Sequence, residues 1–276
     1  MASKQISREM LLPNVRVAAL KAGGSGTVIY SEPNTSGGHS TYVLTNHHVI
    51  ANNIDIKKSW SPVLKHDVKK EFITSADVHF FKYQYQSRAI GVTAIDADIA
   101  GYDPEHDLAL LKLRDEDRAP AVAKLYPKGE ENKLRLGMPV VAIGAGMGEP
   151  PVLTVGRLSQ FAREIENKEF WLSTAPTIFG NSGGALYLED TEELIGVPAR
   201  IAVAMLGFSA DAITHLSFAI PITRIYEFLE EQMFRFIYDP NFTEAGEAEA
   251  RDKKRKDEEF KIANKEMEEV EEEVGV

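Results

Sequence analysis

The sequence predicts an all-β fold. Most of the chain consists of short apolar runs bounded by turn residues, without long helices between them, which is typical of all-β assemblies. The 276 residues suffice for one large or two small cored units, and a composition of 43% hydrophobic and 26% charged residues is that of a globular protein. One stretch differs: Ile225, Leu229, Met233 and Phe236 recur at helical spacing, so a packing helix is expected over 222–237.

The first half of the chain contains a series of expected strands separated by polar or glycine-bearing turns. A short helical turn is expected where the third strand ends, after His48. The expected strands are 15–20, 27–30, 42–48, 78–85, 89–95 and 108–113.

The segment 51–76 is locally basic and contains Trp60. Two interpretations stay open for it. It could be a loop that binds a substrate or partner, or a solvated surface insertion, which is the simpler reading.

The second half begins with a charged segment, 114–135, that reads as a linker punctuated by Pro120 and Pro127. Expected strands follow at 139–144, 152–160, 169–173, 185–188, 194–206 and 213–220. The domain boundaries predicted from this order are an N-terminal segment 1–12, a first unit 13–118, a second unit 119–238 and a charged tail 239–276.

The tail carries apolar residues at alternating three- and four-residue intervals. This pattern predicts a short coiled coil, with a charged helix or a disordered tail as the alternative. The apolar positions are Phe260, Ala263, Met267, Val270 and Val274.

A serine lies between glycines in the stretch 179–186, Phe-Gly-Asn-Ser-Gly-Gly-Ala-Leu. Glycine permits positive φ and close approach of the main chain, as an exposed nucleophilic serine requires. The amides of Gly180 and Ser182 would be the natural donors to an oxyanion. An ordinary glycine-rich turn is the alternative.

Two upstream segments favour nucleophilic chemistry. One apolar run ends on His47 and His48, and Asp107 directly precedes another. A serine nucleophile needs a base and a carboxylate that orients it, and His–Asp–Ser is one of the known chain orders. Rival acids rank lower because none directly precedes a strong apolar strand: Asp96, Asp98 and Asp103.

Four ordered motifs carry a family resemblance: Gly24-Ser25-Gly26-Thr27-Val28-Ile29, Thr45-Asn46-His47-His48-Val49-Ile50, Asp107-Leu108-Ala109-Leu110-Leu111-Lys112 and Gly180-Asn181-Ser182-Gly183-Gly184. Over residues 13–236 the chain resembles trypsin-like serine proteases, and within them the HtrA/Deg branch. The resemblance implies two six-stranded antiparallel β-barrels with a C-terminal helix. By matching position it implies His48 as the base, Asp107 as the orienting acid and Ser182 as the nucleophile. His47 and His106 would lie beside the site, with His47 on the opposite face of the strand from His48.

The resemblance implies hydrolysis of peptide bonds through an acyl-enzyme, with protein or peptide substrates, no cofactor and no metal. One wall of the substrate pocket would be Pro176, Thr177, Ile178 and Phe179. Relatives that cut after Lys or Arg have an acid at the position of Pro176, so a neutral pocket for small or medium apolar side chains is expected. The PDZ module common in the family is not expected in this chain.

Other classes are weighed against this reading. A net charge of −11 argues against binding to nucleic acid, and the absence of a long apolar run argues against a membrane span. Residues 1–10 lack the apolar core of a secretory signal, so a cytoplasmic or otherwise intracellular location is expected. The rival functions are a latent or non-catalytic binding scaffold, because Phe179 replaces a proline frequent in the family, and a chaperone-like protein that forms homo-oligomers through its tail.

Overall fold

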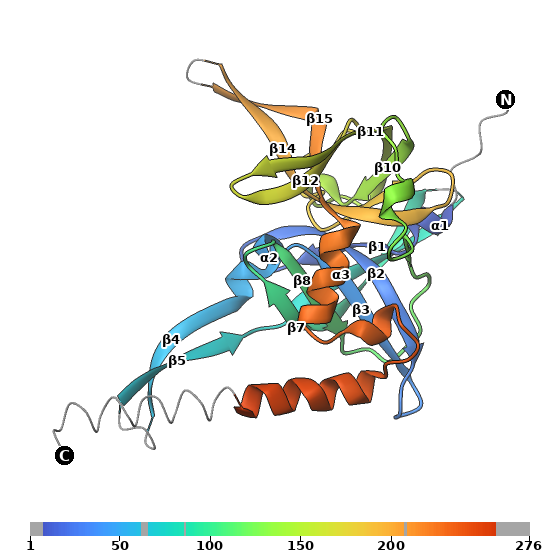
Figure 1. The fold of residues 1–276 in the computed structure, drawn as a ribbon. Coiled ribbons are helices and arrows are strands. Elements are labelled where there is room, and N and C mark those ends of the chain that lie inside the picture. The colour runs from blue at the N-terminus through green and yellow to red at the C-terminus, as the bar shows by residue number, and fades with distance from the viewer. Residues whose placement is uncertain (1–7, 62–65, 86, 207–208, 258–276) are drawn as a thin grey trace. The chain divides into compact units, whose positions relative to one another are not determined.

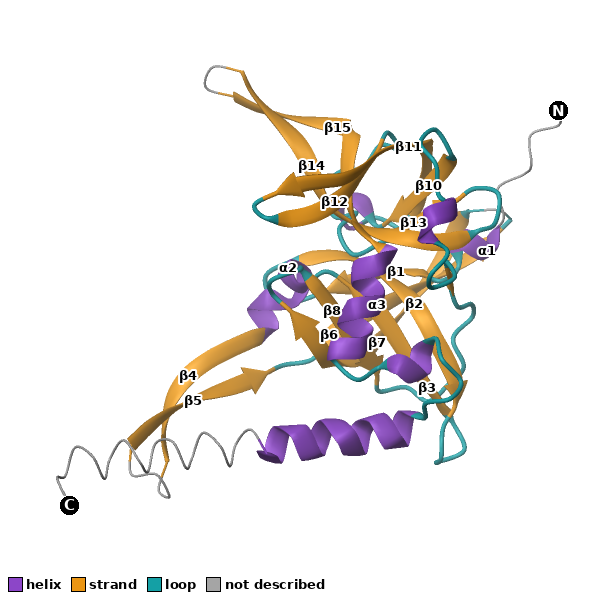
Figure 2. Cartoon of the chain, in the orientation of Figure 1, coloured by secondary structure: helices purple, strands orange, loops and turns teal. Residues whose placement is uncertain are grey.

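The computed structural model describes residues 8–61, 66–85, 87–206 and 209–257 (Figure 1). It divides into two compact units. The first comprises Met1–Asn53 and Thr74–Phe228, and the second comprises Ile54–Ile73 and Leu229–Val276. Strands dominate the first unit (Figure 2), so the predicted all-β class is confirmed.

Six strands of the first unit form a closed antiparallel barrel, in the order β1-β2-β3-β8-β7-β6. The antiparallel pairing of β1 with β6, in which Arg16 lies opposite His79, closes the barrel. The interior is apolar, with Val17, Leu44 and Leu110 fully buried. The strands are β1 Asn14–Ala18, β2 Gly23–Pro33, β3 His39–Thr45, β6 Ala76–Gln84, β7 Arg88–Asp103 and β8 Leu108–Leu113.

A second sheet of the same unit has the order β13-β10-β11-β12-β15-β14-β9. An additional β13–β14 pairing, at Leu186 and Gly196, joins the sheet into a ring of six antiparallel strands, with the short β9 appended in parallel to β14. The double barrel expected from the resemblance is therefore present. The strands are β9 Lys124–Leu125, β10 Pro139–Gly144, β11 Val152–Ile165, β12 Lys168–Ser173, β13 Ala185–Leu188, β14 Glu193–Leu206 and β15 Ser209–Pro221.

The helices labelled in Figure 1 are short. The expected helix over 222–237 is α3, Ile222–Glu231, which ends earlier than predicted because Met233 adopts φ 58°, outside the right-handed helical region. Phe236 is still buried, in a separate 3₁₀ turn. The other helices are α1 Arg8–Leu11 and α2 His47–Ile50, and the 3₁₀ turns are η1 Ala51–Asn53, η2 Glu131–Lys133, η3 Gly146–Gly148 and η4 Arg235–Ile237.

The second unit contains an isolated hairpin, β4 Ile54–Ser61 and β5 His66–Ile73, where the sequence predicted no strand and left a binding loop and a surface insertion open. Its described apolar side chains, such as Trp60 at 61% exposure, lie largely open to solvent. A helix is described over 244–257, whereas the coiled-coil positions 260–274 lie outside the described residues.

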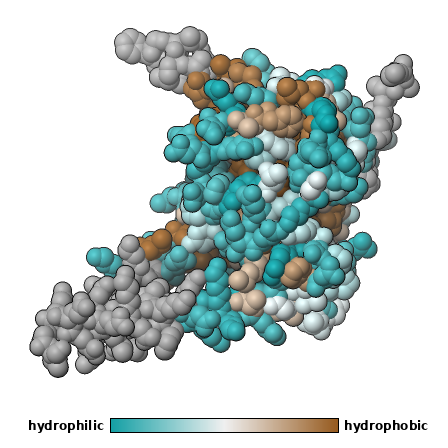
Figure 3. Space-filling model, in the orientation of Figure 1, coloured by the Kyte–Doolittle hydropathy of each residue, from teal (hydrophilic) through white to brown (hydrophobic). Residues whose placement is uncertain are grey.

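The surface shown in Figure 3 is mostly hydrophilic, with smaller hydrophobic areas between the polar ones, consistent with the 26% of charged residues. Within the described part of the chain, no helix has both the length and the apolar character needed to cross a membrane.

Candidate active site

His48 lies in the helical turn α2, which begins directly after strand β3. Asn46 at the junction keeps extended backbone angles, φ −85° and ψ 149°, and starts the turn. His47 and His48 therefore occupy successive helical positions rather than opposite faces of a strand, which corrects the expected alternation. The ring of His47 stacks on Tyr102, with ring centroids 5.5 Å apart.

Both carboxylate oxygens of Asp107 form hydrogen bonds with His48. Oδ2 lies 2.8 Å from the imidazole Nδ1, and Oδ1 accepts the backbone N–H of His48 at 2.8 Å. The carboxylate is shielded, at 17% side-chain exposure, whereas the His48 side chain is 48% exposed. A carboxylate that binds Nδ1 holds the proton there and leaves Nε2 as the free ring nitrogen.

Ser182 lies in a turn whose conformation depends on glycine. Gly180 and Gly183 have φ of 98° and 85°, in the left-handed region. A Cβ at Gly183 would lie 2.2 Å from the carbonyl oxygen of Ser25, so the close approach also excludes a side chain. The turn is held by hydrogen bonds from Asn181 N–H to the Ile178 carbonyl and from Gly183 N–H to the Pro198 carbonyl, both 3.0 Å long.

The amides beside Ser182 are available to a ligand. Among the hydrogen bonds of the described residues, none is donated by the N–H of Gly180 or of Ser182. The carbonyl of Phe179 accepts the N–H of Met147 at 2.8 Å, so it is engaged by the η3 turn. The peptide between Phe179 and Gly180 is thus fixed by a bond to its oxygen while its N–H stays unbound.

Ser25 holds this turn in place from the first barrel, and sequence reasoning assigned it no role of its own. Its buried hydroxyl donates to the Gly180 carbonyl at 2.6 Å and accepts the Ala145 N–H at 2.7 Å. Its backbone N–H donates to the Ser182 carbonyl at 2.8 Å. The signal available in the sequence was a polar residue flanked by glycines in an apolar strand.

His48 and Ser182 line one open cavity of about 400 Å³. The Ser182 hydroxyl lies 3.4 Å from the Ala199 carbonyl, and no hydrogen bond joins it to His48 in the described structure. Of the predicted wall, Thr177, Ile178 and Phe179 line the cavity. Pro176 instead lies exposed outside it, with its carbonyl accepting the Thr154 hydroxyl at 2.7 Å. The opposite wall is Pro198, Ala199, Arg200, Ile201 and Val203, and Asn181 completes the lining.

The charge in the cavity is small. Arg200 lines it, but its guanidinium lies 2.8 Å from the Glu166 carboxylate and 5.5 Å from the centre of the Phe170 ring. Because the arginine is already paired, the cavity has no strong charge that would select an acidic or basic side chain.

The other acids and histidines considered from the sequence lie elsewhere. Asp96 and Asp98 both pair with Arg114, and Asp103 binds His106 and Arg224. Burial lowers the pKa of His47, and this outweighs the opposite effect of nearby Asp107. A neutral His47 in a stacked environment is consistent with a structural role.

Comparisons with known proteins agree with this geometry. The family model of the trypsin-like peptidase domain matches residues 24–197. A probable periplasmic serine endoprotease, DegP-like, of Pseudomonas fluorescens is 31% identical over 202 residues, covering 72% of this chain and 32% of the relative. The chloroplastic protease Do-like 5 of Arabidopsis thaliana is 35% identical over 137 residues, covering 47% of this chain and 40% of the relative.

Solved structures give the same fold. An HtrA-type protease with a tripeptide matches with a TM-score of 0.56 at 21% identity, covering 86% of this chain and 65% of that one. Deg5 matches with a TM-score of 0.54 at 25% identity, covering 80% and 88%.

The comparisons correct the expected location. The bacterial relatives are named periplasmic proteins, which points to an extracytoplasmic rather than a cytoplasmic location. The present chain spans 32 to 33% of the length of these relatives. The double barrel, the four motifs and the matching family model together show that this chain belongs to the trypsin-like peptidase family, with relatives in its HtrA branch.

Proposed function

We propose that this chain is a serine endopeptidase that uses His48, Asp107 and Ser182 as its catalytic residues. The observation that carries the proposal is that His48, whose imidazole is bound by the Asp107 carboxylate, lines the same cavity as the glycine-flanked Ser182. Each member has the chemistry that its role requires: Asp107 holds Nδ1 of the ring, Nε2 is free to take a proton, and Ser182 is exposed enough to attack.

The reaction follows from these positions. Ser182 Oγ attacks the carbonyl carbon of the peptide while His48 Nε2 takes the hydroxyl proton. The tetrahedral intermediate collapses with cleavage of the C–N bond, and His48 returns the proton to the leaving amine. Water, deprotonated by His48, then hydrolyses the ester and releases the acid product and Ser182. The Asp107 carboxylate stays ionised throughout and stabilises the imidazolium.

The unbound N–H groups of Gly180 and Ser182 are the proposed oxyanion donors. An N–H that has no partner in the free protein can turn its full hydrogen-bonding capacity to the charge that develops during attack. The bond from Met147 to the Phe179 carbonyl supports this role because it keeps that carbonyl occupied. The phenylalanine in place of the family's frequent proline is compatible with such a loop.

The cavity lining supports substrates with small or medium apolar side chains before the scissile bond. Three wall residues, Ile178, Pro198 and Ala199, offer apolar surface, and Arg200 is paired with Glu166. Apolar burial gains about 25 cal/mol per Å², whereas an arginine or lysine would enter without an opposing charge. A peptide series that differs only at this position tests the preference. Faster cleavage after Lys or Arg than after Val or Leu would refute it.

The catalytic proposal is tested by labelling with a fluorophosphonate serine probe. Wild type should be labelled at Ser182, and Ser182→Ala and His48→Ala should each abolish labelling while leaving the circular dichroism spectrum unchanged. His47→Ala serves as the matched control, since this neighbouring histidine faces Tyr102, and labelling of that variant should persist.

One observation favours a second candidate, a latent protease or non-catalytic scaffold. The Ser182 hydroxyl is directed to the Ala199 carbonyl rather than to His48. Rotation about χ1 exchanges staggered serine rotamers and would bring the hydroxyl toward the imidazole. A folded wild type that is not labelled by the probe would support the latent form. The chaperone-like alternative depends on self-association, which light scattering on the full chain measures directly.

A further inference from the structure

We propose that Asp103, which is ion-paired with Arg224, is a positioning residue. It holds the turn that carries Asp107 in the conformation in which the Asp107 carboxylate meets the His48 ring. This inference rests on the proposed function, because it assigns Asp103 a part in the orientation of the catalytic histidine. Asp103 ends strand β7 and Asp107 precedes β8, so the two residues bracket the turn that joins these strands.

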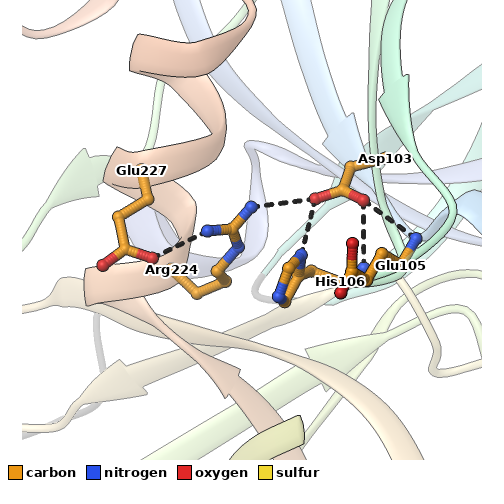
Figure 4. A network of polar contacts seen from close by, with 5 residues as sticks. All are labelled: Asp103, Glu105, His106, Arg224 and Glu227. Atoms are coloured by element: carbon orange, nitrogen blue, oxygen red, sulfur yellow. Dashed lines mark hydrogen bonds and ion pairs between the residues drawn. The ribbon is translucent and has the colours of Figure 1, made fainter.

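The Asp103 carboxylate organises the turn from inside (Figure 4). Oδ1 accepts the backbone N–H groups of Glu105 and His106, at 2.8 and 3.1 Å. Oδ2 accepts the His106 ring at Nδ1, 2.9 Å away, and the Arg224 guanidinium at 3.0 Å. One side chain thus satisfies two backbone donors of the turn and ties it to helix α3.

The turn needs such support because of the conformation at Asp107. This residue has φ of 59°, which is unfavourable for a side chain larger than glycine. Strained backbone persists only where surrounding contacts over-determine it. At the far end of the turn, Asn46 Nδ2 donates to the Asp107 carbonyl at 2.8 Å. Asp103 supplies the corresponding restraint at the near end of the turn. The backbone that carries the Asp107 carboxylate is therefore held by hydrogen bonds at both ends of the turn.

Arg224 makes the restraint strong. Its side chain is 15% exposed and that of Asp103 is 12% exposed, so their ion pair is shielded from water. Burial by itself would raise the pKa of Asp103, but the hydrogen bonds from His106 and Arg224 outweigh it and lower the pKa. The carboxylate is therefore held ionised. The other arm of Arg224 donates to Glu227, one turn further along α3, at 2.8 Å.

Two substitutions remove the clamp while keeping side-chain volume. Asp103→Asn retains one oxygen but brings an NH₂ group against the donors of Arg224 and His106, and Arg224→Met removes the cation. Glu227→Gln is the matched control, because it alters the exposed partner of Arg224 and leaves the bond to Asp103 intact. Arg224→Lys tests rescue by a conservative residue.

The measurements are steady-state kinetics on a peptide substrate and the downfield proton NMR signal of the His48 Nδ1–H···Asp107 bond. In Asp103→Asn and Arg224→Met, we expect kcat to fall about 10- to 100-fold with KM changed less than about twofold. The NMR signal should broaden or move upfield. Glu227→Gln should match wild type in both, and Arg224→Lys should recover part of kcat and of the signal.

Unchanged kcat and an unchanged signal in the two clamp variants would overturn the inference. So would an equal loss in Glu227→Gln, which would indicate a general effect of α3. If Asp103→Asn fails to fold, Arg224→Met decides. The NMR signal can be measured without turnover. If wild type is inactive and Arg224→Met nevertheless loses the signal that wild type shows, the proposed function is refuted while the positioning role of Asp103 stands.

Discussion

Ser25→Ala is the sharpest test of how the site is assembled. The substitution removes one hydroxyl from a fully buried position and changes little else, because alanine keeps the Cβ and the backbone of strand β2. Two hydrogen bonds disappear, the one to the Gly180 carbonyl and the one from the Ala145 N–H. Both partners belong to loops of the second barrel, and the loop of Gly180 contributes Phe179, Asn181 and Ser182 to the cavity lining.

The size of the effect follows from burial. Ala145 is fully buried, so its N–H would be left without an acceptor, which costs about 1–3 kcal/mol. Gly180 is half-buried, so the loss of the hydrogen bond to its carbonyl contributes about 1 kcal/mol. The free energy of unfolding should therefore fall by about 2–4 kcal/mol. The turn that presents the Gly180 N–H also loses one of its restraints, although the bond from Met147 to the Phe179 carbonyl remains. Since deleting an oxyanion donor costs about 10²–10³ in rate, loosening one should cost about tenfold.

The assays are urea unfolding and the rate of fluorophosphonate labelling. Ser159→Ala is the control. Among the described residues its hydroxyl makes one exposed hydrogen bond, to the nearby Arg157 carbonyl at 3.0 Å, whose loss should cost less than about 0.5 kcal/mol. If Ser25→Ala unfolds at the same urea concentration as Ser159→Ala and labels at the wild-type rate, the argument from Ser25 is refuted.

Three further outcomes are expected. Gly183→Ala should unfold the protein or lower its free energy of unfolding by more than about 2 kcal/mol, because the new Cβ would lie 2.2 Å from the Ser25 carbonyl oxygen. Gly129 has a similar φ but open space around it, so Gly129→Ala should cost only about 1 kcal/mol in the same urea titration. Burial lowers the pKa of His47, so as the pH falls this side chain is protonated more readily in the unfolded chain than in the folded one. The free energy of unfolding should therefore decline below about pH 6.5, the ordinary pKa of histidine. His47→Phe should flatten that decline in thermal melts from about pH 7 to about pH 5. Glu247→Gln should loosen the helix 244–257 by about 1–3 kcal/mol, seen as faster hydrogen exchange there. The reason is that Glu247 is buried and its carboxylate accepts hydrogen bonds from the guanidinium and the backbone N–H of Arg235, the shortest of 2.6 and 2.9 Å. Burial raises the pKa of Glu247, but the hydrogen bonds from Arg235 outweigh it and lower the pKa. Acid should therefore loosen this helix in the wild type as well, because protonation of Glu247 removes the interaction.

Many strands were predictable because their burial requires a continuous apolar run bounded by turn residues. Strands 139–144 and 185–188 have the predicted bounds, and their side chains are almost wholly buried. The hairpin β4–β5 was missed for the opposite reason. Its described side chains are mostly exposed, so no burial imposes the alternation by which a strand is recognised. The helix over 222–237 was overextended because periodicity alone does not reveal the left-handed backbone at Met233.

By itself, the sequence determined the fold class, the order of the four motifs and the identity of His48, Asp107 and Ser182 as candidates. These signals are local: a glycine beside a serine, or an acid before an apolar run, reflects constraints that act on neighbouring residues. Only the tertiary structure decided which residues support them. Ser25 reaches Gly180 across 155 residues of sequence, and Asp103 meets Arg224 across 121. A hydrogen bond requires its two atoms within about 3 Å in a set direction, and no pattern along the chain specifies such a meeting until both barrels have folded.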